Sequence, residues 1–389
     1  MTSPTTAPYP TVATDTEHLQ NLCRRSVEVI SDFQDASGAY PASPTFSAYR
    51  GYAWLRDGSF TAEAMSRWAQ VASATAFHHW VAEVLTARAG QVRRLVAART
   101  AGEQPDIAEM LPTRFTLTGR DGDDEWWDFQ TDGYGMWLWA LTTHLQRHQL
   151  PTETWLPAVE VAVDYLCTFG GDACFDWWEE HSEHRHTSTL AAVRAGLLAA
   201  ATIPGLDTDR HDRAQTAAAT LLATILTDAV TDSARERHLT KWIGTDAVDA
   251  SLAACVVPFG VAPVGDPVAV STLAQVAAQL DAGGGVHRFT ADVFYGGGQW
   301  ILLSCLLGWN AVAAGDTAAG WRHLQWAAAQ ANQNGELPEQ VGHHLLHPDH
   351  EQEWIDRWGT VATPLLWSHA MYLILADELG LQPKDDQQP

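Results

Sequence analysis

The sequence predicts an all-α protein that forms an (α/α)6 barrel of six inner and six outer helices. Helical periodicity recurs along the whole chain, and no segment shows the sustained alternation of a convincing strand. Long loops rich in Trp, Asp, Arg and Gly alternate with short connections. Each long loop precedes a helix that is apolar most of the way round, as a buried helix is. An α-solenoid is the structural alternative, but the sequence shows no self-similarity at a fixed period.

The first six expected helices follow from apolar spacing and from local start and stop signals. Leu22 and Ile30 lie on one face of the first helix. Asp57 or Ser59 can cap the second helix, and Pro151 ends the fourth. In chain order the six are 17–33, a segment beginning after Asp57, an Arg- and Ala-rich segment ending near Arg99, a helix centred on 137–148, 153–169 and 187–202.

The remaining six helices are expected on the same grounds. Glycine triplets at 283–285 and 296–298 mark the turn-rich loop before the tenth helix. A long, mostly polar loop separates the eleventh helix from the twelfth. The six are 208–230, a short apolar segment ending near Pro258, 268–280, 300–314, 317–332 and 365–379.

Composition changes only near the two ends of the chain, so we expect one structured domain. Residues 1–14 are rich in Thr, Pro and Ser and predict a mobile tail. The barrel should occupy 15–380, and 381–389 should form a second mobile tail.

The balance of charges excludes several classes of partner. The chain carries 23 Lys and Arg residues against 47 Asp and Glu residues, for a formal net charge of −24. Such a surface repels nucleic acid and anionic membranes, so we expect neither as a partner. The 18 tryptophans exceed what packing requires. Indole faces stack on sugar rings, and nearby carboxylates and arginines bind their hydroxyls, so a neutral polyhydroxylated ligand is expected.

Cysteine usage and the N-terminal sequence indicate a reducing compartment. The five cysteines are odd in number and form no CxxC pair, which argues against a disulfide framework and a zinc knuckle. The first residues lack the basic and apolar regions of a signal peptide. No apolar run reaches the length of a membrane span. We expect a cytoplasmic protein, a monomer rather than an oligomer.

The stretch CFDWWEEHSEHRH at 174–186 is the strongest local candidate for chemistry. Carboxylates are normally exposed and tryptophans normally buried, yet here Asp176, Glu179 and Glu180 surround two adjacent indoles. Burial against an indole raises the pKa of a carboxyl group, as a general acid at neutral pH requires. The alternative is a helix start with acidic side chains at the positive end of the dipole. The motif alone favours that alternative.

Six motifs taken together favour the catalytic interpretation of this stretch over a simple helix start. They are YAWLRDG (52–58), FQTDGYG (129–135), DWWEE (176–180), RFTADVFYGGGQW (288–300), LPEQ (337–340) and TPLLWSHAMY (363–372). With them the sequence resembles glycoside hydrolase family fifteen, the glucoamylase family, over residues 52–372. The resemblance implies an exo-acting, inverting α-glucoside hydrolase on an (α/α)6 barrel, with each motif at the start of an inner helix.

The resemblance also implies roles for single residues. Carried over by motif, Glu179 is the general acid and Glu339 the general base. Glu180 binds hydroxyls near the scissile bond. Other candidate substrate-binding residues within or beside these motifs are Trp54, Arg56, Asp57, Trp127, Asp132, Trp178, Arg288 and Trp300.

The chemistry of inversion supports two distant carboxyl groups. Inverting hydrolysis places a protonated carboxyl on the leaving oxygen and an ionised one on the opposite face, roughly 6.5–9.5 Å apart. Glu179 and Glu339 can face each other from different loops, whereas Glu179 and Glu180 cannot. Spacing alone leaves Glu336 as a rival for the base.

The sequence also carries patterns that are found in proteins of other functions. The histidines near 181–186 and 343–350 have spacings seen in metal sites, but no fixed ligand motif is present. The glycine triplets lack a P-loop lysine. We therefore expect no metal and no cofactor. A catalytically idle sugar-binding protein and a glycoside phosphorylase remain alternatives on the same barrel.

The expected substrate is a small α-glucoside. The motifs begin by residue 52, which leaves no room before them for the β-sandwich domain of many bacterial family members. Trp354 and Trp358, in a long loop at 341–358, can cap the site behind one further sugar. The best candidate is isomaltose (α-1,6). Hydrolysis of α-1,4-glucosides or of trehalose is the alternative.

Overall fold

The computed structural model of the protein describes residues 16–126, 129–231 and 237–382. The expected tail at 1–14 lies outside these residues, as do 383–389 of the second tail. Leu381 is buried, and Gln382 donates a hydrogen bond to the carbonyl of Arg67 (2.7 Å), so the chain is packed through residue 382.

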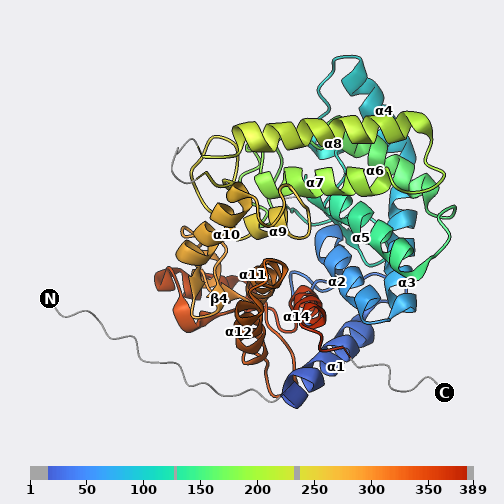
Figure 1. Ribbon diagram of the computed structural model, residues 1–389. Coiled ribbons are helices and arrows are strands. Elements are labelled where there is room, and N and C mark those ends of the chain that lie inside the picture. The colour runs from blue at the N-terminus through green and yellow to red at the C-terminus, as the bar shows by residue number, and fades with distance from the viewer. Residues whose placement is uncertain (1–15, 127–128, 232–236, 383–389) are drawn as a thin grey trace.

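Twelve helices in the described part of the chain form two concentric layers (Figure 1). The inner layer consists of α2 (Leu55–Arg67), α5 (Asp132–His148), α7 (Thr187–Ala200), α9 (Leu252–Val256), α11 (Ile301–Ala313) and α14 (Leu366–Glu378). The outer layer consists of α1 (Thr16–Phe33), α3 (Val71–Ala87), α6 (Leu156–Phe169), α8 (Thr208–Asp228), α10 (Pro267–Leu280) and α12 (Thr317–Ala328).

The inner layer is a closed ring. Each inner helix contacts the next in chain order, and α14 returns to α2. Burial separates the layers: every residue of α2 from Leu55 to Ser66 is buried, whereas α8 buries only four of its 21 residues. This arrangement confirms the predicted (α/α)6 barrel, and its apolar inner helices confirm the reason for predicting it.

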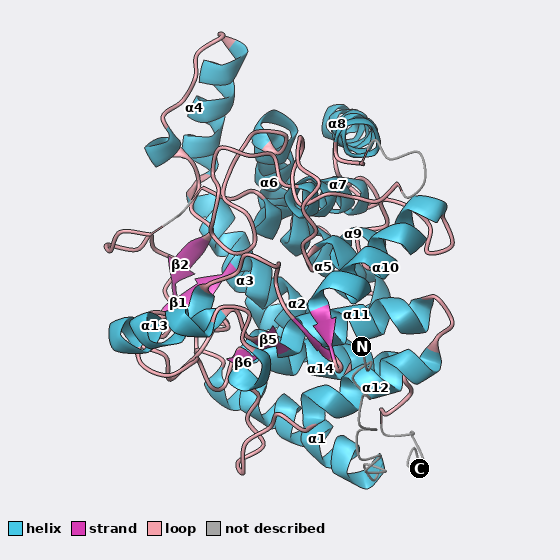
Figure 2. Ribbon diagram, turned by 90° about the vertical axis from the view of Figure 1, so that its left-hand side faces the viewer, coloured by secondary structure: helices cyan, strands magenta, loops and turns pink. Residues whose placement is uncertain are grey.

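Three details differ from the expectation. The third helix ends at Ala87, and a separate α4 (Ala89–Thr100) projects from the barrel and buries only Val92 and Leu95 (Figure 2). A further helix, α13 (Glu351–Trp358), interrupts the loop before α14. Short strands are present where none was expected, because two or three residues are too few for alternation to be visible in a sequence.

These strands form two small antiparallel sheets. In the first, β1 (Tyr52–Trp54) pairs with β2 (Arg114–Thr116), which sets Trp54 opposite Arg114. The second has the order β3-β4-β5-β6. Its strands are β3 (Asp281–Ala282), β4 (Gly285–Val286), β5 (Gln299–Trp300) and β6 (Gln340–Val341). The second sheet ties the loop before α11 to the loop before α14.

Two glycines let α5 and α7 approach closely. A Cβ atom on Gly196 would lie 2.2 Å from the carbonyl oxygen of Gly135, and one on Gly135 would lie 2.5 Å from the carbonyl oxygen of Ala192. Any larger residue therefore forces the two inner helices apart.

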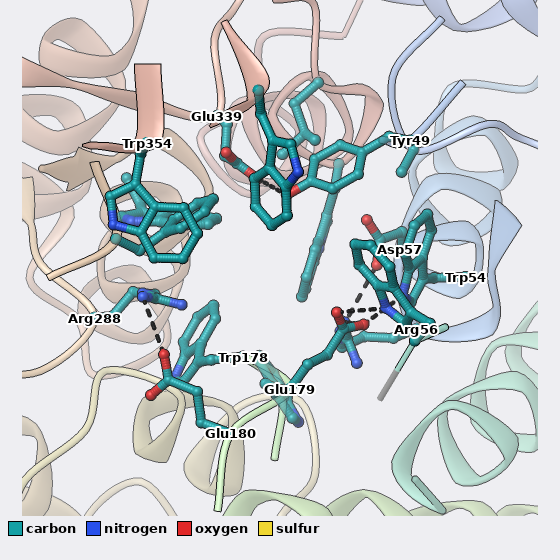
Figure 3. Close-up of a pocket in the computed structure, with 18 of the residues that line it drawn as sticks. Tyr49, Trp54, Arg56, Asp57, Trp178, Glu179, Glu180, Arg288, Glu339 and Trp354 are labelled. Atoms are coloured by element: carbon teal, nitrogen blue, oxygen red, sulfur yellow. Dashed lines mark hydrogen bonds and ion pairs between the residues drawn. The ribbon is translucent and has the colours of Figure 1, made fainter. Parts of the chain in front are cut away.

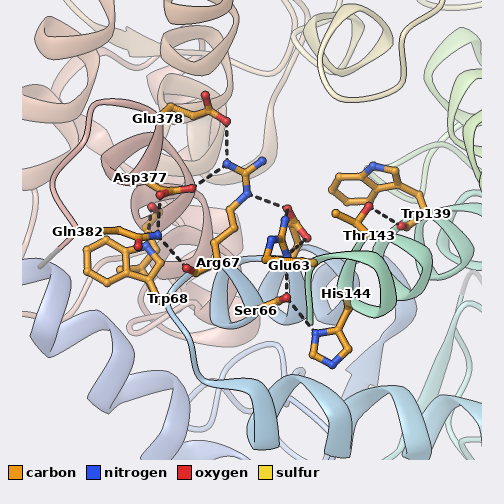
Figure 4. Close-up of polar contacts among 12 residues, drawn as sticks. Glu63, Ser66, Arg67, Trp68, Trp139, Thr143, His144, Asp377, Glu378 and Gln382 are labelled. Atoms are coloured by element: carbon orange, nitrogen blue, oxygen red, sulfur yellow. Dashed lines mark hydrogen bonds and ion pairs between the residues drawn. The ribbon is translucent and has the colours of Figure 1, made fainter. Parts of the chain in front are cut away.

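An ion-pair network joins the C-terminal ends of α2, α5 and α14 (Figure 4). The fully buried carboxylate of Glu63 accepts hydrogen bonds from Arg67 (2.7 Å) and Arg147 (2.6 Å). Arg67 also donates to Asp377 (3.0 Å) and Glu378 (2.7 Å). The network lies at the end of the barrel remote from the long loops.

Candidate active site

A pocket of about 190 Å³ lies among the loops at the N-terminal ends of the inner helices. Four carboxylates, two arginines and eight tryptophans dominate its wall (Figure 3). The polar members are Arg56, Asp57, Glu179, Glu180, Arg288 and Glu339, and the tryptophans are Trp54, Trp126, Trp177, Trp178, Trp300, Trp354, Trp358 and Trp367. Apolar faces combined with a few convergent polar groups are typical of a sugar-binding site.

Glu179 lies in a tight turn that precedes α7. Its φ of +65° is in the left-handed region, which is uncommon for a residue other than glycine. The Oδ1 atom of Asp176 accepts the backbone N–H groups of Trp178 and Glu180, each at 2.9 Å, and so closes the turn. Strained residues of this kind are concentrated at functional sites.

The carboxylate of Glu179 is held by donors from distant loops. The indoles of Trp54 and Trp126 donate to its two oxygens, at 2.5 and 2.8 Å. The guanidinium of Arg56 lies 3.5 Å from it. Burial raises the pKa of Glu179, and the charge of Arg56 and the two indole hydrogen bonds oppose that rise.

Glu339 lies across the pocket, immediately before β6. Its Oε1 atom accepts a hydrogen bond from the hydroxyl of Tyr49 (3.1 Å), and Oε2 is buried without a hydrogen-bond partner among the described residues. Burial raises the pKa of Glu339 to about 8, against the opposing effects of Tyr49 and Arg288. Figure 3 shows Glu179 and Glu339 on opposite sides of the cavity, as an inverting hydrolase requires.

Glu336, the rival for the base, is placed elsewhere. Its carboxylate accepts a hydrogen bond from the side-chain amide of Asn332 (2.8 Å), and it does not line the pocket. Of the two glutamates, the structure brings only Glu339 into the site.

Arg56 and Asp57 form the polar wall beside Glu179. Arg56 lies 3.6 Å from Asp57 and donates to Gln130 (2.5 Å). Burial raises the pKa of Asp57 to about 7, and Arg56 opposes the rise. Asp132, a predicted substrate-binding residue, does not line the pocket. Its fully buried carboxylate lies 3.5 Å from Arg56, behind the wall, and accepts the N–H of Gly133 (2.8 Å) at the start of α5.

Arg288 and Glu180 form a second polar group across the pocket. Their side chains approach to 3.5 Å. Asp292 binds the guanidinium of Arg288 with both carboxylate oxygens and orients it. The same guanidinium lies 5.3 Å from the ring centroids of Trp178 and Trp300, so aromatic faces fix it as well.

The structure brings nine of the eleven predicted site residues together. Asp132 is the exception, and Trp127 lies outside the described residues. The prediction missed Tyr49, Trp126, Phe294 and Trp367, which also line the pocket. Tyr49 stands three residues before the first motif, so proximity to that motif was the available signal.

Two other observations bear on the expected function. Within the described ranges, no group of three or more His, Cys, Asp or Glu side chains is arranged to hold a metal ion. His184 instead stacks on Trp242, with ring centroids 4.4 Å apart. No helix in the part of the chain that the structure describes has the length and apolarity to cross a membrane.

Comparison with known proteins gives consistent matches. The model of the family described as glycosyl hydrolases family 15 matches residues 16–335. The isomaltose glucohydrolase of Kribbella flavida is 61% identical over 366 residues, which make up 94% of each chain.

Solved structures extend the comparison. A glycosidase is 60% identical, with a TM-score of 0.92 over 95% of this chain and 99% of that one. A glutamate-to-alanine variant described as a glycosidase in complex with glucose matches equally well. A bacterial glucoamylase in complex with acarbose is 21% identical, with a TM-score of 0.74 over 93% of this chain and 56% of its own, and shares the fold.

Proposed function

Because the chain belongs to glycosyl hydrolase family 15 and is a glycoside hydrolase, we propose that it hydrolyses isomaltose with inversion and releases β-glucose from the non-reducing end. The observation that carries this proposal is the pair of carboxyl groups, Glu179 and Glu339, on opposite sides of a small pocket. The identity to an isomaltose glucohydrolase supports the choice of substrate.

In the proposed reaction, Glu179 donates its proton to the glycosidic oxygen as the bond from C1 to that oxygen breaks. A water molecule held by Glu339 attacks C1 from the other face and gives up a proton to Glu339. Water thus adds to C1, and the leaving sugar gains a hydroxyl. Arg56, Asp57 and Arg288 bind sugar hydroxyls.

The two pKa shifts do not by themselves assign the acid and the base. Burial raises the pKa of Glu339 to about 8, so the ionised form that a base needs is the minor one at neutral pH. Arg56 and two indoles favour the ionised form of Glu179. The family resemblance supplies the assignment, and substrates that differ in their leaving group can test it.

Glutamine variants separate the two roles. Fluoride leaves with little need of a proton, so Glu179→Gln should lose roughly 10²–10⁴-fold in kcat on isomaltose and much less on α-glucosyl fluoride. Glu339→Gln should lose activity on both substrates. Glu336→Gln is the matched control and should retain both activities. If Glu339→Gln instead retains activity on α-glucosyl fluoride and Glu179→Gln loses activity on both substrates, Glu339 is the acid and Glu179 the base.

The leaving-sugar side of the pocket supports a short substrate. Trp354 and Trp358 of α13 line it, and the indole of Trp358 stacks on Trp126 with ring centroids 6.3 Å apart. We therefore propose that the pocket accepts about one further sugar beyond the non-reducing glucose. A comparison of kcat/KM across isomaltose, longer isomaltooligosaccharides, maltose and trehalose should favour isomaltose. Best turnover of maltotetraose or soluble starch would overturn the linkage and the short pocket.

Proton NMR of the first product tests inversion. β-Glucose should appear before mutarotation produces the α anomer. If α-glucose appears first, the reaction proceeds through a covalent intermediate, and the proposed roles of Glu179 and Glu339 are wrong.

We also propose that the enzyme acts as a monomer in the cytoplasm. All five cysteines are free thiols, and four of them are buried, as suits a reducing compartment. The net charge of −24 opposes self-association through mutual repulsion. Light scattering at increasing protein concentration should give a constant mass near 42.5 kDa.

A further inference from the structure

Lys241 is a buried cation behind the pocket. It is one of two lysines in the sequence, and it is 4% exposed. Its Nζ atom lies 3.2 Å from Asp249, 3.6 Å from Asp176 and 3.2 Å from the centroid of the Phe289 ring. Burial of an ammonium group is unfavourable unless nearby charges compensate it. Lys241 does not line the pocket, so it has no direct contact with a bound sugar.

The two carboxylates that face Lys241 hold Trp178 from two sides. Asp176 accepts the backbone N–H of Trp178 (2.9 Å), and Asp249 accepts its indole N–H (2.9 Å). Trp178 immediately precedes Glu179. The backbone and the ring of this tryptophan therefore depend on the same pair of buried anions, and Lys241 is the cation of the described residues that lies within ion-pair distance of both.

The turn that these contacts fix is the one that presents Glu179. The carbonyl of Asp176 accepts the N–H of Glu179 (3.0 Å), and the N–H of Asp176 donates to the carbonyl of Glu180 (3.1 Å). A left-handed conformation at Glu179 is unfavourable and persists only when its surroundings enforce it. Without Lys241, the two buried carboxylates would repel each other more strongly, and the turn that holds Glu179 would be less restrained.

We propose that Lys241 is a positioning residue, whose ammonium group neutralises Asp176 and Asp249 so that they hold Trp178 and, through it, the carboxyl group of Glu179. This inference rests on the proposed role of Glu179 as the general acid. Lys241 contributes to proton donation without contact with the substrate, because it helps to fix the position of the carboxyl group of Glu179.

A charge-balance experiment tests this role. Lys241→Met should lower kcat on isomaltose by roughly 10- to 100-fold, because a small displacement of a catalytic group has effects of this size. The loss on α-glucosyl fluoride should be much smaller. The double variant Lys241→Met/Asp249→Asn should regain part of the activity, because it removes one uncompensated charge and the single side-chain oxygen of asparagine can accept the indole N–H of Trp178, at the cost of the bond that Asp249 accepts from the backbone of Ser251.

A matched control uses a partly buried cation elsewhere, Arg67. Arg67→Met removes the central charge of the network at the far end of the barrel, so it should lower thermal stability and leave the ratio of the two activities unchanged. Equal losses on both substrates for Lys241→Met, as from a general destabilisation, would show that Lys241 is merely structural.

A measurement independent of activity completes the test. The indole N–H signal of Trp178, assigned from its absence in Trp178→Phe, should shift in the ¹H–¹⁵N spectrum of Lys241→Met and return toward its original position in the double variant. An unmoved signal would overturn the proposal. If the unmodified enzyme releases no glucose from any α-glucoside, the proposed function fails, while the spectrum still reports whether Lys241 positions Trp178.

Discussion

At the scale of single residues, the two proposed catalytic carboxyl groups differ in exposure and in partners: Glu339 is buried, whereas Glu179 is partly exposed to the pocket. Glu179 receives two indole hydrogen bonds and faces Arg56, whereas Glu339 has the hydroxyl of Tyr49 and the more distant charge of Arg288. Tyr49 is therefore the nearest group that favours the ionised form of Glu339. Removal of its hydroxyl should therefore raise the pKa of Glu339.

Tyr49→Phe should move the acidic limb of the pH profile of kcat/KM to higher pH. The hydrogen bond from Tyr49 stabilises the carboxylate and lowers its pKa, so without it the pKa of Glu339 rises further above about 8. A base must be ionised, and activity near pH 6 should fall accordingly. Tyr40→Phe, which removes a buried hydroxyl that bonds Ser73, should leave the limb in place. A limb that does not move would show that Tyr49 has no effect on the base.

Sequence motifs predicted most of this site because its charged residues belong to those motifs. Arg56, Asp57, Glu179 and Arg288 each occupy a motif that precedes an inner helix. Tyr49 could not be assigned in the same way, because its contact with Glu339 joins positions 290 residues apart. Such a pairing is set by the closure of the ring, and no local pattern records it.

At the scale of elements, α13 forms the outer wall of the pocket. None of its residues is buried, yet Trp354 donates its indole N–H to the carbonyl of Val293 (2.9 Å) and lines the cavity with Trp358. The sequence predicted that these tryptophans cap the site but placed them in an irregular loop. An eight-residue helix is too short to stand out from its polar surroundings.

Trp358→Ala should widen the pocket on the leaving-sugar side. Loss of the indole removes the stacking on Trp126 and opens space for longer chains, so kcat/KM for isomaltotriose should rise relative to isomaltose. Gln352→Ala, on the exposed part of the same helix, should leave this ratio unchanged. An unaltered ratio in Trp358→Ala would contradict the role of α13 in chain-length selection.

The contact of α5 with α7 gives a stability prediction. Gly196→Ala places a methyl group against the carbonyl of Gly135 and should lower the free energy of unfolding by about 1–3 kcal/mol. Gly90→Ala on the projecting α4 is the opposite case. Its added methyl group meets only arginine side chains, at 3.8 and 3.9 Å, and should raise stability by about 0.5–1 kcal/mol. Urea unfolding followed by circular dichroism measures both, and equal effects would contradict the close approach.

At the scale of the whole molecule, alternation of long and short connections was enough to predict the barrel. The prediction failed where local geometry depends on tertiary contacts: the break between α3 and α4, the two small sheets, and the position of Asp132 behind Arg56. Asp132 begins an inner helix inside a matching motif. Only the packing of α5 against α2 shows that its carboxylate supports Arg56 from the far side.

The ion-pair network around Glu63 should stabilise the ring without affecting catalysis. Glu63→Gln leaves Arg67 and Arg147 without their shared charge and should lower the free energy of unfolding by about 1–3 kcal/mol. Activity per folded molecule should stay constant, because the network lies away from the pocket. Arg25→Gln, which breaks a largely exposed pair with Glu28, should change stability by less than about 1 kcal/mol. A Glu63 variant as stable as the original would contradict this role.

Closure of the ring by α14 against α2 has a consequence for biosynthesis. The two helices are separated by about 300 residues, a distance that a ribosome covers in roughly 15 to 60 s at 5–20 residues per second. Single helices form, and their apolar faces come together, on the order of microseconds. For most of its synthesis, therefore, the nascent chain holds formed helices whose apolar faces have no final neighbour. The barrel is completed only when α14 emerges, and until then those faces are exposed and prone to aggregation.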